Sequence, residues 1–141
     1  MTAQDRAVLR LELVRDEGIR LRPYTDAVGK LSIGCGRNLT DVGITTAEVE
    51  VLLEHDIDVA IAELDRTQPW WTRLDGVRQR VLVNMAFNMG MPRLLGFRRM
   101  WQALEQDEYE TAADEMEESV WAIQVGARAE RLASMMRSGA V

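Results

Sequence analysis

Two carboxylic acids and one hydroxyl near the N-terminus have the residue types and the spacing that cleavage of a glycosidic bond could use. Glu17 precedes a glycine, Asp26 follows after eight intervening residues, and Ser32 follows after five more. A glycosidase places two carboxyl groups beside the sugar bond, one to protonate the leaving oxygen and one to assist a water molecule or the sugar ring. Each acid also has a simpler explanation, because a glutamate can end an exposed helix and an aspartate before a turn is common.

The segment before Glu17 predicts a helix that would hold this carboxyl group at its end. Thr2 is suited to cap a helix over residues 2–16, and apolar residues between positions 8 and 14 give it a broad apolar side. Gly18 is a typical helix stop. The negative end of a helix dipole and partial burial both favour a protonated carboxyl group, which is the form a general acid requires.

The sequence after this helix predicts a short β-hairpin with one unusually bare face. Apolar residues alternate there with Ser32, Gly34 and Gly36, so one face of the strand is apolar and the other carries a single hydroxyl. A strand face without side chains indicates that another group approaches the backbone closely. Asp26 lies just before the hairpin turn, so the chain could set it opposite Glu17.

The rest of the chain predicts helices. Ile44-Thr45-Thr46-Ala47-Glu48 has the pattern of a hydrophobic staple and capping box, and helical spacing then continues to about Asp65. The segment from Leu74 to Met89 is apolar on most sides, which predicts a helix at the centre of the core. Shorter helices are predicted over residues 95–106, 108–119 and 126–137. The acidic stretch from Asp107 to Glu118 is most simply a solvated helix face.

Composition argues against several classes of protein. A chain of 141 residues suits one domain with one continuous core. Cys35 is the only cysteine and His55 the only histidine, so no internal disulfide is possible and a zinc site is not expected. The net charge of −6 argues against nucleic acid as a partner. No apolar run is long enough to span a membrane, and no secretory signal is recognisable at the N-terminus.

The same residues carry a resemblance to a known family. Arg15 to Leu21, Tyr24-x-Asp26, Gly29 and Ser32-Ile33-Gly34-x-Gly36 resemble the catalytic region of the phage-type lysozymes, the endolysin muramidases of glycoside hydrolase family 24. The family motif is a Glu, eight residues, an Asp, five residues and a Thr. The similarity extends, in the same order, through the segments 43–48, 83–90, 96–97 and 119–131, and so covers most of the chain.

The resemblance implies a role for each member of the motif. Glu17 would protonate the glycosidic oxygen, Asp26 would orient or activate water or stabilise positive charge on the sugar, and Ser32 would hold the water. The reaction would be inverting and would need no metal or cofactor. Ser32 replaces the family's threonine, which keeps the hydroxyl but loses the methyl group that restricts its rotamer.

The resemblance also implies supporting residues. Arg128 matches an arginine that pairs with the catalytic glutamate. Arg37 stands where a relative has a histidine paired with an aspartate, and that aspartate is present as Asp56. We therefore predict an Arg37–Asp56 ion pair.

Substrate-binding residues are predicted from both the resemblance and the helical spacing. Asn88, Phe87 and Gly36 would line the groove. Asn84 lies one helical turn from Asn88 on an otherwise apolar helix, and we expect it to have a structural role. Trp121 is expected in the core rather than as a sugar platform.

The fold implied by the resemblance is α+β, lysozyme-like, mostly helical and two-lobed. A small hairpin lobe would comprise residues 18–60, a helical lobe residues 1–17 and 61–141, and the active-site groove would lie between them. The expected activity is hydrolysis of the β-1,4 bond between N-acetylmuramic acid and N-acetylglucosamine. The alternatives are a lytic transglycosylase, against which Asp26 and Ser32 argue, a chitinase, and a non-catalytic peptidoglycan-binding protein.

The expected partner is the glycan strand of peptidoglycan, with no nucleic acid and no membrane insertion. We expect a monomer held in the host bacterial cytoplasm before release, with a holin as one route, and active on the peptidoglycan layer of the periplasm. Cell walls are anionic whereas this chain is acidic, so a local basic rim is expected beside the groove. Its expected members are Arg20, Arg22, Lys30 and Arg37.

Overall fold

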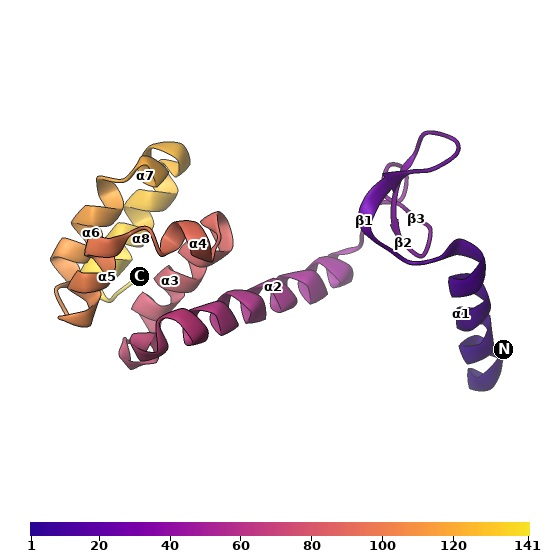
Figure 1. Cartoon of the computed structure of the whole chain (residues 1–141), viewed down its shortest axis with the longest axis horizontal. Coiled ribbons are helices and arrows are strands. Elements are labelled where there is room, and N and C mark those ends of the chain that lie inside the picture. Colours follow the sequence, from indigo (N-terminus) through magenta and orange to yellow (C-terminus); the bar gives the residue numbers. More distant parts are fainter. The chain divides into compact units, whose positions relative to one another are not determined.

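A computed structural model describes all residues, 1–141, and divides them into two compact units. The first unit is Met1–Val51 and the second is Leu52–Val141. Figure 1 shows the first unit in indigo and violet and the second in magenta to yellow. Three antiparallel strands lie in the first unit and a group of helices makes up the second, which confirms the predicted α+β class.

The first unit begins with helix α1, Ala3–Glu17. Thr2 caps it as predicted, because the Thr2 hydroxyl accepts from the Asp5 backbone N–H at 3.1 Å and the Asp5 side chain accepts in return. Gly18 ends the helix with a positive φ of 73°, a conformation that suits glycine. The helix therefore ends where the sequence predicted, with Glu17 as its last residue.

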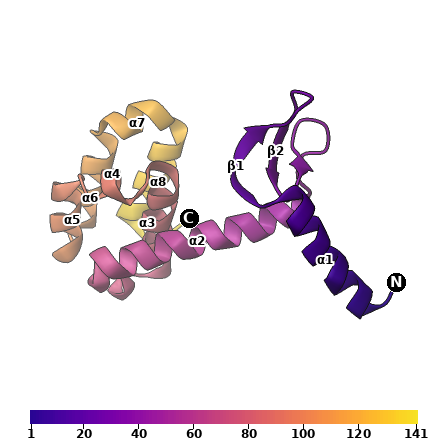
Figure 2. The same ribbon diagram turned by 45° about the vertical axis from the view of Figure 1, so that its right-hand side comes forward.

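The sheet has three strands in the order β1-β2-β3, with β1 over Arg20–Thr25, β2 over Leu31–Gly34 and β3 over Arg37–Asn38. Figure 2 shows β1 and β2 running side by side. In their register Tyr24 pairs with Ser32, while Arg20 pairs with Gly34, so the intervening part of β1 bulges. The two-residue strand β3 is too short to produce an alternating pattern, and the sequence did not predict it.

Helix α2, Thr46–Thr67, begins in the first unit and continues into the second. The predicted capping box is present, since the Glu48 carboxylate accepts from the Thr45 backbone N–H at 2.8 Å. The Glu48 backbone N–H in turn donates to the Thr45 hydroxyl at 3.3 Å. None of the helices has the length and apolar composition that crossing a membrane would require.

The second unit contains a 3₁₀ turn and the remaining helices. These are η1 at Pro69–Arg73, α3 at Gly76–Met89, α4 at Met91–Leu94, α5 at Arg98–Glu105, α6 at Tyr109–Glu117, α7 at Val120–Val125 and α8 at Ala127–Ser138. The helix predicted over residues 95–106 corresponds to α5 and begins three residues later than predicted, and the short helix α4 before it was not predicted. The six-residue helix α7 was not predicted.

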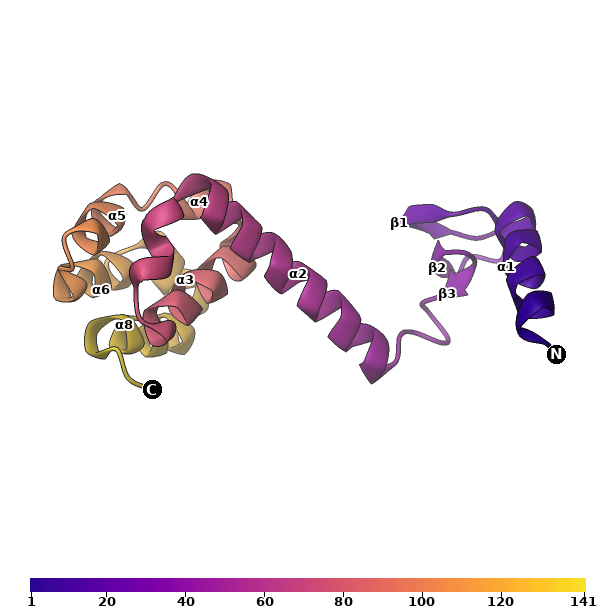
Figure 3. The ribbon, with the colours of Figure 1, turned by 90° about the horizontal axis from the view of Figure 1, so that it is seen from below.

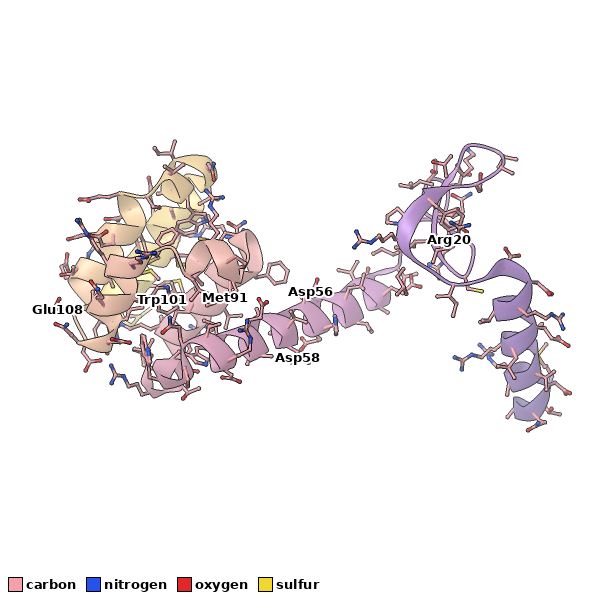
Figure 4. The ribbon with its side chains drawn as sticks, in the orientation of Figure 1. Arg20, Asp56, Asp58, Met91, Trp101 and Glu108 are labelled. Atoms are coloured by element: carbon pink, nitrogen blue, oxygen red, sulfur yellow. The ribbon has the colours of Figure 1, made fainter.

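The buried apolar core lies entirely in the second unit, between Ala60 and Met136. Helix α3 contributes Val81, Leu82 and Met85, each with no exposed surface, which confirms that it is central. Figure 3 shows α3, α5, α6 and α8 gathered in this unit, and Figure 4 marks Met91 and Trp101, two of its core side chains. The predicted core position of Trp121 is confirmed, because only 1% of it is exposed.

Candidate active site

Glu17 is positioned by the end of α1. The Gly18 backbone N–H donates to the Val14 carbonyl at 2.9 Å, which closes the last turn of the helix behind the glutamate. The Glu17 side chain is exposed and forms no ion pair within the protein. Its carboxylate is therefore held by a capped helix end but remains free to meet a ligand.

The turn that follows β2, at Cys35 and Gly36, lies against this carboxylate. A Cβ atom added to Gly36 would lie 3.1 Å from Oε2 of Glu17, closer than an ordinary contact. Gly36 has a φ of 74°, so a side chain there would also strain the backbone. The neighbouring Cys35 thiol donates to the Leu13 carbonyl of α1 at 3.5 Å. The predicted close approach to the bare face is therefore found only at Gly36, which lies in the turn after β2, whereas nothing lies within 4 Å of a Cβ position at Gly34.

Asp26 stabilises the hairpin turn, which was the simpler explanation for an aspartate at this position. One of its carboxylate oxygens accepts no hydrogen bond from the protein. Its Oδ1 accepts from the backbone N–H groups of Val28, at 3.0 Å, and Lys30, at 2.8 Å. The Asp26 backbone N–H also donates to the Lys30 carbonyl at 2.8 Å. Oδ2 accepts no hydrogen bond from the protein. The turn thus fixes the carboxylate by one oxygen and leaves the other available.

Ser32 is the only polar residue of the chain that is buried, with 3% of its surface exposed. It lies on the central strand, opposite Tyr24 of β1 and Asn38 of β3. Its hydroxyl has no hydrogen-bond partner in the protein, yet it is not sealed from solvent. A hydroxyl whose hydrogen-bond donor and acceptor are not used within the protein is suited to hold a water molecule.

Arg37 has a different partner from the one predicted. Its Nη1 and Nη2 donate to the two carboxylate oxygens of Glu48 at 3.0 and 2.6 Å, instead of pairing with Asp56. The capping box turns Glu48 back toward the start of α2, whereas Asp56 lies about 12 Å further along the helix axis. Hydrogen bonds from Arg37, the largest cause, and from Thr45 lower the pKa of Glu48 from 4.5 to about 2. Figure 4 marks Asp56 on α2.

In the second unit, Asn84 and Asn88 hold different partners. The Asn84 side-chain oxygen accepts from Nε and Nη2 of Arg128 at 3.0 and 2.7 Å, in line with its predicted structural role. The Asn88 side-chain oxygen accepts from the indole N–H of Trp121 at 2.8 Å, which leaves its exposed amide group free to donate. The pairing of Arg128 with Glu17 and the substrate contacts of Asn88 stay predictions.

A hollow of about 490 Å³ lies on the second unit among residues of α2, α3 and α8. Phe87, which is 46% exposed, lines it together with Trp71, Asn84 and Arg128. Trp71 is buried and donates its indole N–H to the Asp65 carboxylate at 2.7 Å. Tryptophans beside a proline carry no periodic signal, so the burial of Trp71 could not be predicted from residue spacing.

Residues 14–137 match the sequence family described as Phage lysozyme. The chain belongs to the phage lysozyme family. It is 28% identical to "Probable T4-type lysozyme 1" of Dictyostelium discoideum, over 88% of this chain and 90% of the relative. "Probable T4-type lysozyme 2" of the same organism has the same identity and coverage. The "Pre-baseplate central spike protein Gp5" of Enterobacteria phage T4 is 29% identical over 90% of this chain, which corresponds to 27% of that longer protein.

Membership of the phage lysozyme family confirms the resemblance on which the sequence interpretation rested. It also confirms the lysozyme-like α+β fold, since a mostly helical chain with a small antiparallel sheet is what the structure contains. Membership of this family supports a glycosidase of the lysozyme class, which is the class that the motif predicted.

The predicted basic rim is only partly free to meet an anionic ligand. Lys30 pairs with Asp41 at 3.0 Å and Arg37 pairs with Glu48. Arg20, marked in Figure 4, has its guanidinium carbon 4.8 Å from the centre of the Tyr24 ring. Arg20 and Arg22 have no acidic partner, so they are the uncompensated cations of the predicted rim.

Proposed function

We propose that the chain is a muramidase that hydrolyses the β-1,4 bond between N-acetylmuramic acid and N-acetylglucosamine in peptidoglycan. The observation that carries the proposal is the close approach of Gly36 to the Glu17 carboxylate. A backbone without a side chain leaves the carboxylate open on that side, where a sugar oxygen could reach it. Glu17 acts as the general acid that protonates the leaving oxygen.

Asp26 and Ser32 position the attacking water in this proposal. The free Oδ2 of Asp26 can accept a proton from water, and the Ser32 hydroxyl can hold the same water by a hydrogen bond. A water activated by a carboxylate and held by a second group is the arrangement that an inverting glycosidase uses. The two groups are available for this because neither is fully engaged within the protein.

The second unit supplies substrate contacts in this proposal. Phe87 offers an exposed ring beside the hollow, and Asn88 offers an amide donor whose orientation is fixed by Trp121. Arg128 supports Glu17. We also propose that residues 1–17 belong to the helical lobe.

The test is loss of turbidity of outer-membrane-permeabilised Gram-negative cells. Glu17→Gln keeps the shape of the side chain but removes the transferable proton, so we expect the lysis rate to fall at least about 100-fold. Glu12→Gln is the matched control, because Glu12 is an exposed glutamate of the same helix. Equal clearing by Glu17→Gln and the wild type would contradict the role of Glu17.

The products distinguish a hydrolase from a transglycosylase. A muramidase adds water and releases reducing ends, whereas a lytic transglycosylase releases anhydro sugars. We expect reducing ends from the wild type and none from Glu17→Gln. A product mixture dominated by anhydro sugars would replace the proposal with the second activity, and binding without either product would favour a non-catalytic peptidoglycan-binding protein.

The proposed setting is the peptidoglycan layer of the periplasm. The chain acts there as a monomer, after release from the host cytoplasm by a route such as a holin. Analytical ultracentrifugation of the purified chain tests the monomer, and lysis of producing cells with and without a co-expressed holin tests the route. Lysis at the same time in both cultures would contradict holin dependence.

A further inference from the structure

The ion pair of Arg37 with Glu48 connects two parts of the first unit that do not follow one another in the chain. Arg37 opens β3 directly after Gly36, and Glu48 lies in the first turn of α2. The contact is a bidentate fork, in which Nη1 and Nη2 of Arg37 each donate to one carboxylate oxygen of Glu48. Nη1 also donates to the Gly43 carbonyl at 3.2 Å. Such a fork restricts both side chains more than a single contact would.

The capping box holds the acidic half of this pair in place. Oε2 of Glu48 accepts from the Thr45 backbone N–H at 2.8 Å in addition to Arg37. The carboxylate is therefore anchored to the helix start independently of the arginine. Arg37 is in this way fixed to a rigid element, the beginning of a 22-residue helix.

The residue before Arg37 is the one that lies against Glu17. Arg37 pairs with Ile33 across the sheet, so the ladder closes the turn through Gly34 and Gly36, and the fork ties the same residue, Arg37, to the start of α2. The glycines themselves offer no side chain to hold this turn. Without the fork, only the ladder and the long Cys35–Leu13 hydrogen bond would hold the peptide at Gly36 beside the Glu17 carboxylate.

We propose that Glu48 is a positioning residue for the general acid, acting through Arg37 to fix the Gly36 backbone against the Glu17 carboxylate. The inference rests on the proposed role of Glu17. Glu48 touches neither the substrate nor the reacting atoms in this proposal. Its effect belongs to kcat rather than to KM, because it sets the geometry of proton transfer and makes no sugar contact.

The experiment compares Glu48→Gln, Arg37→Gln and the double variant with the wild type, using soluble peptidoglycan fragments. Glutamine at position 48 still serves a capping box, so the start of α2 is retained while the charged fork is lost. We expect kcat to fall about tenfold and KM to stay within about twofold, since a displacement below 1 Å can cost that much. The double variant should match the single variants, because both remove the same contact.

Asp41→Asn is the matched control, because it makes the same carboxylate-to-amide change in the other ion pair of the first unit that joins separate segments. It should leave kcat unchanged. Circular dichroism verifies folding. If Arg37→Gln does not fold, Arg37→Lys is used instead, since lysine keeps the charge but cannot form the fork. A wild-type kcat in folded Glu48→Gln and in the folded Arg37 variant would overturn the proposal.

Failure of the inference is distinct from failure of the proposed function. Wild-type cleavage above the Glu17→Gln background is measured first, and its absence would remove the proposed function. Cleavage by the wild type together with an unchanged kcat in Glu48→Gln would remove only the positioning role. A fall in kcat that Asp41→Asn shares would also overturn it, because the effect would then belong to any charge of this unit.

Discussion

At the scale of single residues, the site depends on which groups the fold leaves free. Glu17 has no ion-pair partner in the protein, one oxygen of Asp26 accepts nothing, and the Ser32 hydroxyl has no partner. Buried polar groups are usually hydrogen-bonded within the protein, so the buried Ser32 hydroxyl without a protein partner is the most informative of the three, and it supports the proposed water site.

Gly36 gives the first residue-scale prediction. Gly36→Ala would bring a methyl group to about 3.1 Å from the Glu17 carboxylate, so we expect kcat to fall at least about tenfold. Gly34→Ala is the control for backbone strain, because Gly34 also has a positive φ, of 68°, but open space around its Cβ position. Both variants should lose stability in thermal unfolding. Equal kcat values for the two variants would show that strain, and not the contact with Glu17, explains the loss.

At the scale of elements, the sequence predicted what local patterns determine. The cap at Thr2, the stop at Gly18, the capping box at Thr45 and the central helix α3 all follow from neighbouring residues, and all are confirmed. The two-residue strand β3 and the short helices α4 and α7 were missed. Each of these is shorter than the window over which a period of 2 or 3.6 residues can be recognised.

The sequence also predicted part of the candidate site. The spacing of Glu17, Asp26 and Ser32 and the bare glycine face were visible in the sequence, but the partner of Arg37 was wrong. That pairing depends on the direction in which the capping box turns the Glu48 side chain, which residue spacing does not contain. Family resemblance pointed to a partner further along the same helix.

The link between α6 and α8 gives an element-scale prediction of stability. Arg137 of α8 donates to Glu110, Asp114 and Glu117 of the acidic helix α6, at 2.7, 2.8 and 2.9 Å. Arg137→Met would leave these carboxylates to repel one another, so we expect Tm to fall by several degrees. Arg99→Met should change Tm little, because Arg99 is 81% exposed on its side chain and lies 3.8 Å from Glu115. Equal Tm values for the wild type and Arg137→Met in differential scanning calorimetry would contradict this link.

The start of α2 gives a prediction about acid stability. Folding lowers the pKa of Glu48 from 4.5 to about 2, chiefly through its hydrogen bond from Arg37. A lowered pKa stabilises the folded state above pH 4.5, and this contribution is lost as pH falls toward about 2. We therefore expect Glu48→Gln to reduce the difference in stability between pH 6 and pH 2, measured by urea unfolding. An unchanged pH dependence would contradict the assignment.

At the scale of the whole molecule, the charge is acidic although the proposed substrate is anionic. The net charge is −6, and Arg20 and Arg22 are the cations of the predicted rim that no carboxylate neutralises. If these two attract the wall, salt should screen the attraction, so we expect wall lysis to slow as ionic strength rises. Arg22→Gln should show a weaker salt dependence than the wild type. Lysis that is independent of salt, or faster in salt, would contradict the role of these arginines.

The burial of apolar side chains is uneven along the chain, and this has a consequence for how the molecule opens. Every buried apolar residue lies between Ala60 and Met136, whereas Ser32 is the only buried residue among the first 59. Segments with few buried contacts open locally at low free energy, and their amide hydrogens exchange with solvent before those of the core. Amides of the sheet should therefore exchange by local opening, and those of α3 only by global unfolding. The proposed catalytic residues would then belong to the most easily opened cooperative unit. A destabilising change in the helical core would leave the protein folded, whereas a change of similar size in the sheet would impair the reaction.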